Sequence, residues 1–303
     1  MVMVERVVQA FPQMEPEDFK VLRALELEMR HHEWVPFERL LERTGFDEKE
    51  LGYRLSRLDR WDMIIRTRRE TVGYLGYQLR PEGYDALALR VLVEEGIIEG
   101  LGPEIGVGKE ADVYLGISPK GVELAVKFNR IGRTSYTKIK RYREYVKDKR
   151  HISWLYVNRL TAEREFEALL HLYPEGVPVP RPVYQNRHVL VMKRFRGREL
   201  AETRVDDPEL VLRGVMEAYH RALEVGVVHG DLSQFNIVVE KDGSVLIIDW
   251  AHWVELGHPS APELIERDVR NVCEYFRRKY RVRVDYREFL PDEEVYGGRG
   301  APR

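Results

Sequence analysis

The feature that most constrains this chain is a polar motif, His229-Gly-Asp-Leu-Ser-Gln-Phe-Asn236, followed by Ile247-Ile-Asp249-Trp. Between the two, short β-branched runs flank an Asp-Gly turn, which predicts a tight hairpin with Asn236 before it and Asp249 after it. Phosphoryl transfer from a nucleotide needs such a set, because one carboxylate orients the attacking hydroxyl while a carboxamide and a second carboxylate hold Mg²⁺. We therefore predict Asp231 as a catalytic residue and Asn236 and Asp249 as Mg²⁺ ligands. An ordinary loop with polar turn residues is the alternative.

An upstream segment supplies the other half of a nucleotide site. Residues 104–114 contain closely spaced glycines, which let backbone N–H groups approach phosphates without a Cβ clash. Residues 122–128 form an apolar strand with one lysine, Lys127, which is costly to bury without an anionic partner. We expect Lys127 to contact the α- and β-phosphates of ATP. The loop over the triphosphate is assigned to Gly106, Gly108 and Lys109.

A helix predicted from about Ser153 to Tyr173 offers a second partner for Lys127. Its apolar face is marked by Ala162, Phe166, Leu169 and Leu170. Glu165 lies one helical turn before Leu169 and borders this face, so it is chosen as the Lys127 partner, with Glu163 as the alternative.

The first 90 residues have the pattern of a separate module. Three helices are predicted, one from Pro16, a second over residues 37–43 and a third from an Asp47 N-cap with Glu50 completing a capping box. Two strands around Gly73 follow, and three helices with a hairpin make a winged helix. We expect the basic residues of this module to be exposed and to contact a nucleic-acid groove. They are Lys49, Arg54, Arg57 and Arg60 on the third helix and Arg66, Arg68 and Arg69 on the wing. Docking of a protein is the alternative.

Several segments together resemble the RIO family of atypical protein kinases: GVGKEADVY, LAVKF, AEREFEAL, HGDLSQFN and IDWA. The resemblance covers residues 12–280, and the winged helix points to the second subgroup of the family. It implies an α+β fold, an N-terminal winged helix followed by a minimal two-lobed protein-kinase-like domain. The expected boundaries are residues 1–95 for the winged helix, 96–195 and 196–285 for the two lobes, and 286–303 for a tail.

The resemblance also implies an activity. It suggests use of ATP and Mg²⁺, autophosphorylation on Ser or Thr, and a role in late maturation of the small ribosomal subunit. Some family members are thought to act more as ATPases through an aspartyl-phosphate on the metal-binding Asp, which would match Asp249 here.

The segment 189–195 is expected to be the strand and hinge between the lobes. Met192 would line the adenine site, and the main chain of residues 193–195, Phe195 included, would bind adenine. A core strand with an exposed end fits nearly as well. Lys193 and Arg194 replace the acidic residue common at this hinge in related kinases, which puts any side-chain contact in doubt. In a later helix, Arg267 and Asp268 are expected to be structural ion-pair residues.

Charge is distributed unevenly along the chain. The net charge is −2, but residues 129–150 contain far more Lys and Arg than acidic residues. We expect this segment, together with the winged helix, to contact a small-ribosomal-subunit precursor, its RNA and its proteins, although a solvated charged face is the usual alternative. Ser135 within it is a hypothetical autophosphorylation site.

With one cysteine, Cys273, and no long apolar run or signal-peptide pattern, we expect a cytoplasmic protein without a membrane contact.

Two other function classes remain open. Aminoglycoside and choline phosphotransferases also carry an HGD loop and an Ile-Asp-Trp-like metal motif, so a small-molecule kinase is one alternative. The winged helix and the GKEADVY segment argue against it. The other is an RNA-binding module for which ATP is a conformational ligand, which an intact catalytic set disfavours.

Overall fold

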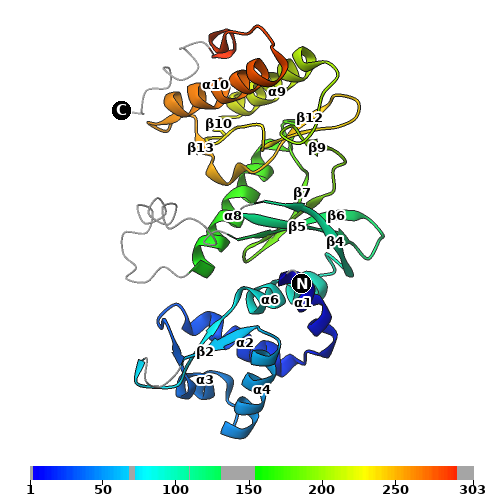
Figure 1. Cartoon of the computed structure of the whole chain (residues 1–303). Helices are drawn as coiled ribbons and strands as arrows, with labels where there is room; N and C mark the ends of the chain where they lie inside the picture. The colour runs from blue at the N-terminus through cyan, green and yellow to red at the C-terminus, as the bar shows by residue number, and fades with distance from the viewer. Residues whose placement is uncertain (1–2, 68–71, 109, 131–153, 292–303) are drawn as a thin grey trace. The chain divides into compact units, whose positions relative to one another are not determined.

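The computed structural model describes residues 3–67, 72–108, 110–130 and 154–291 (Figure 1). The chain divides into two compact units, the first made of residues 1–160 and 185–189 and the second of residues 161–184 and 190–303. The N-terminal helices and the glycine-containing strands therefore belong to the first unit. The catalytic loop and its hairpin belong to the second.

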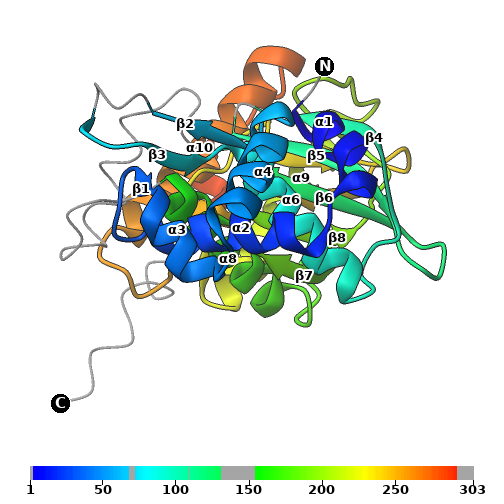
Figure 2. The same cartoon turned by 90° about the horizontal axis from the view of Figure 1, so that it is seen from below.

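The predicted winged helix is present in the first unit. Its helices and hairpin are α2 (Pro16–Glu28), α3 (Phe37–Thr44), α4 (Glu48–Arg60), β2 (Ile64–Arg66) and β3 (Gly76–Leu79). Helix α2 packs against α3, α4 and α6 (Pro81–Glu94), which Figure 2 shows around it. The Asp47 carboxylate accepts the Glu50 main-chain N–H at 2.8 Å, so the predicted N-cap of α4 is confirmed, whereas the Glu50 carboxylate accepts from Arg54 instead of completing the capping box.

Two elements of this domain were not predicted. Helix α1 (Met3–Ala10) buries Val4 and Val7 and packs on α6. Strand β1 (Val35–Pro36) pairs antiparallel with β3, which gives the sheet order β1-β3-β2. A strand of two residues contains no periodicity, so only the tertiary pairing reveals it.

Three antiparallel strands complete the first unit: β4 (Gly100–Val107), β5 (Ala111–Ile117) and β6 (Glu123–Asn129). They belong to a five-stranded sheet of order β4-β5-β6-β8-β7, with β7 (Pro182–Asn186) and β8 (Val189–Lys193). Helix α8 (Trp154–Leu172) follows β6 in sequence. The predicted apolar face of α8 is wrong at one position, because Leu170 is 51% exposed while the neighbouring Leu169 is buried.

The second unit places the predicted hairpin against helix α9. Strand β11 (Ile237–Val239) pairs antiparallel with β12 (Val245–Ile247), so the predicted hairpin is present, and β9 (Arg198–Glu199) extends this sheet. Helix α9 (Pro208–Glu224) packs on both β12 and α10 (Ala261–Tyr280). The remaining short elements are β10 (Val227–Val228), η2 (Trp250–His252), β13 (Val254–Glu255) and η3 (Tyr286–Phe289).

Apolar side chains from both helices and the hairpin fill the core of the second unit. The largest of them are fully buried, among them Trp250, Tyr219 and Phe276. Cys273 is also buried, and burial raises the pKa of its thiol to about 12. No helix in the described ranges is long and apolar enough to cross a bilayer.

Candidate active site

The catalytic loop of the second unit, residues 229–236, is held by the buried ring of His229. Its Nδ1 accepts the main-chain N–H of Asp231 at 3.2 Å, and its Nε2 donates to the carbonyl oxygen of Ile248 at 3.0 Å. These partners assign the proton to Nε2. The ring thus braces the loop against the end of the hairpin. The Asp231 side chain is exposed, where a substrate hydroxyl can reach it.

Asp268 on α10 anchors the same loop from the other side. Its carboxylate accepts the main-chain N–H groups of Gly230 at 2.8 Å and Leu232 at 3.0 Å, and the Tyr219 hydroxyl donates to it at 3.1 Å. Arg267 donates to the carbonyl oxygen of Gly230. Both residues are structural, as predicted, but they act through the main chain of the catalytic loop instead of the expected ion pair.

A signal for Asp268 was present in the sequence. Apolar residues of α10 recur at helical spacing, and Asp268 lies within that stripe, fully buried beside Ile265, Val269 and Val272. A carboxylate in a buried stripe requires hydrogen-bond donors. Burial raises the pKa of Asp268, against the opposing effects of His229 and of the three hydrogen bonds.

The loop passes Gly230 in a conformation that requires glycine. Its φ is +77°, in the left-handed region, and a Cβ there would lie 2.7 Å from the carbonyl oxygen of His252. The glycine of the HGD motif therefore lets the loop approach the segment that follows Asp249.

The two predicted metal ligands flank the hairpin at its open end. The main-chain carbonyl of Asn236 accepts the N–H of Ile248 at 2.9 Å, so the ladder between β11 and β12 continues to the residue before Asp249. The Oδ1 atom of Asn236 accepts the Ser233 hydroxyl at 2.8 Å. Asp249 adopts a left-handed backbone conformation, with φ 65° and ψ 57°. The structure thus brings Asn236 and Asp249 to one edge of the hairpin, as predicted.

This pair of side chains is chemically suited to Mg²⁺. A carboxamide and a carboxylate supply the oxygen ligands that Mg²⁺ prefers, and the amide oxygen of Asn236 has a second lone pair. Acidic side chains also lie close together here, since burial and the nearby charges of Glu202 and Asp249 raise the pKa of Glu199. A cation bound by Asn236 and Asp249 would offset that charge.

In the first unit, strand register aligns the predicted phosphate-binding residues. Gly106 of β4 lies opposite Val113 of β5, which lies opposite Lys127 of β6. Directly paired residues share a face of a sheet, so Lys127 faces the same side as the glycine segment. The Gly108 N–H donates to the carbonyl of Ala111 at 2.8 Å and closes the turn between β4 and β5. Lys109 lies outside the described residues.

Lys127 and its chosen partner Glu165 are both buried. Glu163, the alternative, is half-buried. Because Lys127 belongs to the first unit and Glu165 to the second, their pairing stays a prediction. For the adenine site, Met192 is buried on β8 and Phe195 follows the strand half-buried, so these assignments also stay predictions.

Within the second unit, Arg164 and Trp253 join α8 to the segment after Asp249. The Trp253 indole N–H donates to the carbonyl of Arg164 at 3.0 Å, and the Arg164 guanidinium donates to the carbonyls of Trp253 and Ala251. The guanidinium also lies 5.5 Å from the Trp253 ring centroid. Glu165 is the next residue along α8, so this reciprocal contact ties its helix to the metal segment. Sequence analysis had not assigned either residue.

Comparison with known proteins agrees with this geometry. Residues 112–289 match the family model of the RIO domain, and residues 11–95 match that of the Rio2 N-terminal domain. The chain belongs to the RIO family. Its N-terminal domain places it in the Rio2 subgroup, and its activity class is that of the RIO-type serine/threonine protein kinases.

Relatives span nearly the whole chain. The RIO-type serine/threonine-protein kinase Rio2 of Methanocaldococcus jannaschii is 43% identical, over 84% of this chain and 93% of its own length. The rio2 kinase of Schizosaccharomyces pombe is 34% identical, over 95% and 83%. The crystal structure of the Rio2 kinase–ADP/Mg²⁺–phosphoaspartate complex from Chaetomium thermophilum matches with a TM-score of 0.81 and 29% identity, covering 97% of this chain and 90% of that one.

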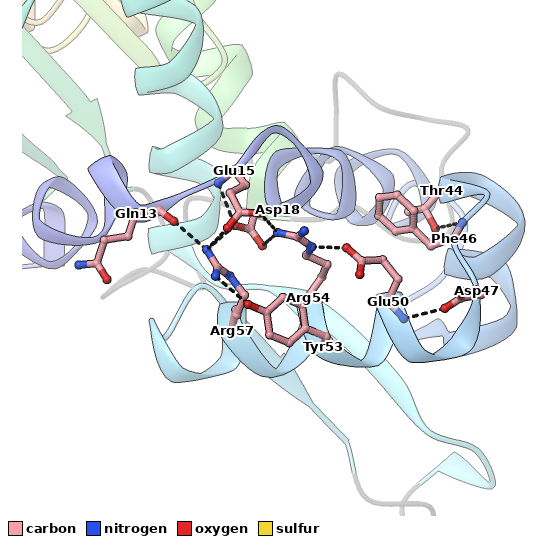
Figure 3. A network of polar contacts seen from close by, with 10 residues as sticks. All are labelled: Gln13, Glu15, Asp18, Thr44, Phe46, Asp47, Glu50, Tyr53, Arg54 and Arg57. Atoms are coloured by element: carbon pink, nitrogen blue, oxygen red, sulfur yellow. Dashed lines mark hydrogen bonds and ion pairs between the residues drawn. The ribbon is translucent and has the colours of Figure 1, made fainter.

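The structure corrects one prediction for the Rio2 N-terminal domain, because Arg54 is buried instead of exposed. Its guanidinium pairs with Glu15 at 2.7 Å, with Glu50 at 2.6 Å and with the fully buried Asp18 at 3.4 Å (Figure 3). Hydrogen bonds and ion pairs to Glu15 and Glu50 offset the cost of burying Arg54 and keep its pKa above the ordinary value.

Arg57 is held by the same network. It pairs with Asp18 at 3.1 Å and donates to the carbonyl of Gln13 at 2.7 Å and to the Tyr53 hydroxyl at 3.0 Å (Figure 3). Two of the four arginine and lysine residues assigned to a nucleic-acid surface on α4 therefore fasten α4 to the start of α2. Lys49 and Arg60 remain exposed on α4, and Arg66 on β2. Arg68 and Arg69 lie outside the described residues.

The predicted basic segment 129–150 also needs correction at its start. Asn129 and Arg130 are both buried, and the Asn129 amide donates to the carbonyl of His188 at 3.2 Å. Arg130 is paired with acidic residues of the protein itself and presents no charge to a partner. Residues 131–150, with Ser135, lie outside the described residues.

Proposed function

We propose that this Rio2 homologue binds ATP with Mg²⁺ and transfers the γ-phosphoryl group to Ser or Thr, including its own, or to water. The observation that carries the proposal is the catalytic edge of the second unit, where His229 and Asp268 hold the loop with Asp231 and the hairpin brings Asn236 to Asp249. Phosphoryl transfer depends mainly on positioning and charge stabilisation, which this rigid edge supplies.

In this proposal the tasks of nucleotide binding are divided among the residues. Lys127, held by Glu165, contacts the α- and β-phosphates, and the turn with Gly106, Gly108 and Lys109 covers the triphosphate. Asn236 and Asp249 hold Mg²⁺, which neutralises charge on the phosphates when bound. Met192 and the main chain near Phe195 receive adenine. Asp231 orients the attacking hydroxyl or water.

A phosphoaspartate step is part of the proposal. The Chaetomium Rio2 complex contains ADP, Mg²⁺ and a phosphoaspartate. In this chain Asp249 is the proposed acceptor: a carboxylate oxygen forms the new P–O bond as the bond to ADP breaks, and water then attacks the phosphorus and releases phosphate. Such turnover would make the protein an ATPase as well as a kinase.

We further propose that the protein acts in the cytoplasm on the small-ribosomal-subunit precursor, contacting its RNA and proteins. Support for this partner comes from the family resemblance and from the basic residues that are exposed, Lys49, Arg60 and Arg66. The basic composition of residues 131–150 is further support from the sequence. Because Arg54, Arg57 and Arg130 pair internally, they are left out of the proposed contact surface.

The test is incubation of the pure protein with γ-labelled ATP and Mg²⁺, with and without small-subunit particles. Acid-stable label on Ser or Thr supports the kinase, hydroxylamine-labile label on Asp249 supports the phosphoaspartate, and particle-stimulated phosphate release supports ribosomal action.

Asp231→Ala should abolish transfer while leaving ATP binding nearly intact, and Asp249→Ala should also remove Mg²⁺-dependent binding. Wild-type rates in Asp231→Ala would refute the role of Asp231, and particles without effect would refute the proposed partner.

A further inference from the structure

A buried cluster of charges joins the Rio2 N-terminal domain to the kinase-like strands inside the first unit. Asp85 on α6, Asp112 on β5, Arg130 after β6 and His188 before β8 are all buried. Asp85 lies within the Rio2 N-terminal match, and the other three lie within the RIO-domain match.

Arg130 is the centre of this cluster. Its Nη1 and Nη2 atoms donate to the two carboxylate oxygens of Asp85 at 2.6 and 2.8 Å, and its Nε donates to Asp112 at 3.0 Å. Two parallel bonds fix both the direction and the rotation of a guanidinium, so Asp85 decides where Arg130 lies. His188 Nε2 lies 2.7 Å from the same Asp85 carboxylate, and its ring stacks on Tyr84 at 4.5 Å.

These contacts keep Asp85 ionised. Burial alone would raise its pKa, but the charge of Arg130 and the hydrogen bonds from His188 and Arg130 outweigh burial, and the pKa lies below its ordinary value. Burial lowers the pKa of His188, so the ring stays neutral and donates through Nε2.

Arg130 also reaches the turn that carries the predicted phosphate-binding glycines. Its main-chain N–H donates to the carbonyl of Glu110 at 2.6 Å, two residues after Gly108. Asp112, bonded to its side chain, is the second residue of β5 and lies opposite Val107 of β4. One arginine thus holds the outgoing side of the turn by a main-chain and a side-chain bond.

We propose that Asp85, on the N-terminal domain, is a positioning residue for the phosphate-binding turn of the kinase domain, acting through Arg130. The proposal rests on the nucleotide site proposed above. A buried ion pair adds little net stability, but removing one partner leaves an uncompensated buried charge, so the partner that remains must move or rearrange. When Asp85 holds Arg130, the turn stays where its N–H groups meet the β- and γ-phosphates.

The chain offers a matched control. Glu26 on α2 pairs with Arg187, at 2.9 and 3.0 Å, in the turn between β7 and β8. This second ion pair also joins the N-terminal domain to the kinase-like strands; its Glu26 carboxylate is buried and Arg187 is half-buried, and none of the bonds described for either residue reaches the phosphate-binding turn. Glu26→Gln and Asp85→Asn therefore remove one carboxylate charge each from comparable sites.

The test compares the dissociation constants of ATP and adenosine for the full chain and both variants by calorimetry, with Tm recorded alongside. We expect Asp85→Asn to weaken ATP binding by about tenfold relative to adenosine, within the usual range of coupling between sites. Glu26→Gln should lower Tm but leave the ratio of the two constants unchanged. Asp85→Glu, which keeps the charge but moves Arg130, should also change the ratio and serves where Asp85→Asn does not fold.

An unchanged ratio in Asp85→Asn or Asp85→Glu, with only Tm lowered, would overturn the inference and leave the proposed function standing. An equal change of the ratio in Glu26→Gln would also overturn it, because domain attachment in general would then be the cause. A wild-type protein that binds no ATP would overturn both the inference and the proposed function.

Discussion

The two units use buried acidic residues differently. In the first, Asp18, Asp85 and Glu26 pair with arginines from distant segments. In the second, Asp268 bonds mainly to main-chain N–H groups of one loop. An arginine pair of this kind fixes two segments relative to each other, because its two side chains come from segments that are far apart in the sequence. A carboxylate bonded to the main chain fixes the shape of the loop itself.

The strongest test of this contrast is Asp268→Ala. Removing the carboxylate leaves the N–H groups of Gly230 and Leu232 buried without acceptors, so the free energy of unfolding should fall by about 3 kcal/mol. The catalytic loop would shift, and a displacement of about 1 Å should reduce phosphoryl transfer about 100-fold. Urea denaturation and a labelled-ATP assay measure both; a variant with lowered stability but full activity would contradict the role of Asp268.

Arg54→Met tests the other side of the comparison. Glu15, Glu50 and the buried Asp18 would lose a shared partner, so we expect the free energy of unfolding to fall by about 3 kcal/mol. Nucleotide binding should hold in the surviving folded fraction, since no described contact links Arg54 to the strands of the nucleotide site. The exposed Arg60→Met is the control and should change stability by less than about 0.5 kcal/mol. Equal effects of the two substitutions would show that the network of Figure 3 is not stabilising.

Backbone demands of the loop can be separated from ordinary turn strain. Gly230→Ala places a Cβ against His252, whereas Gly243→Ala, at φ +85°, meets nothing within 4 Å. Both substitutions should lower the free energy of unfolding by about 1 kcal/mol, because alanine is strained in a left-handed conformation. Gly230→Ala should lower it by about 2 kcal/mol more because of the clash. Chemical denaturation of both variants gives the difference, and equal losses would argue against the close approach.

The smallest expected effect is a difference in the sign of pH dependence. The pKa of Asp85 is lowered in the fold, so its contribution is full above the unfolded value of about 3.9 and is lost as pH falls through the folded value. The pKa of Asp268 is raised, so its contribution is full below about 3.9 and is lost as pH rises through the folded value.

The measurement is chemical denaturation of wild type, Asp85→Asn and Asp268→Asn at pH values from about 7 to about 3, a range that includes the unfolded carboxyl pKa of about 3.9. From neutral to acid pH, the wild-type advantage over Asp85→Asn should shrink, and its advantage over Asp268→Asn should grow, each by about 1 kcal/mol. Parallel slopes for the two pairs would remove this part of the contrast.

The hairpin and its ligands were open to prediction because their signals are local. The Asp-Gly turn and the β-branched runs predicted the hairpin, and its register in the structure brings Asn236 next to Ile248. The winged helix was likewise predicted from caps and periodicity, including Asp47. Arg54 and Arg130 were misassigned because the sequence does not show whether a charged side chain faces solvent or a buried carboxylate.

The sequence by itself determined most of the helices and strands, the hairpin with Asn236 before it and Asp249 after it, and the motifs that resemble a kinase family, because turns, periodicity and short motifs depend on neighbours along the chain. Only the tertiary structure decided which charged side chains are buried and paired within the protein. Asp85 and Arg130 are 45 residues apart in the chain, and burial of a charge depends on partners that folding brings from that distance.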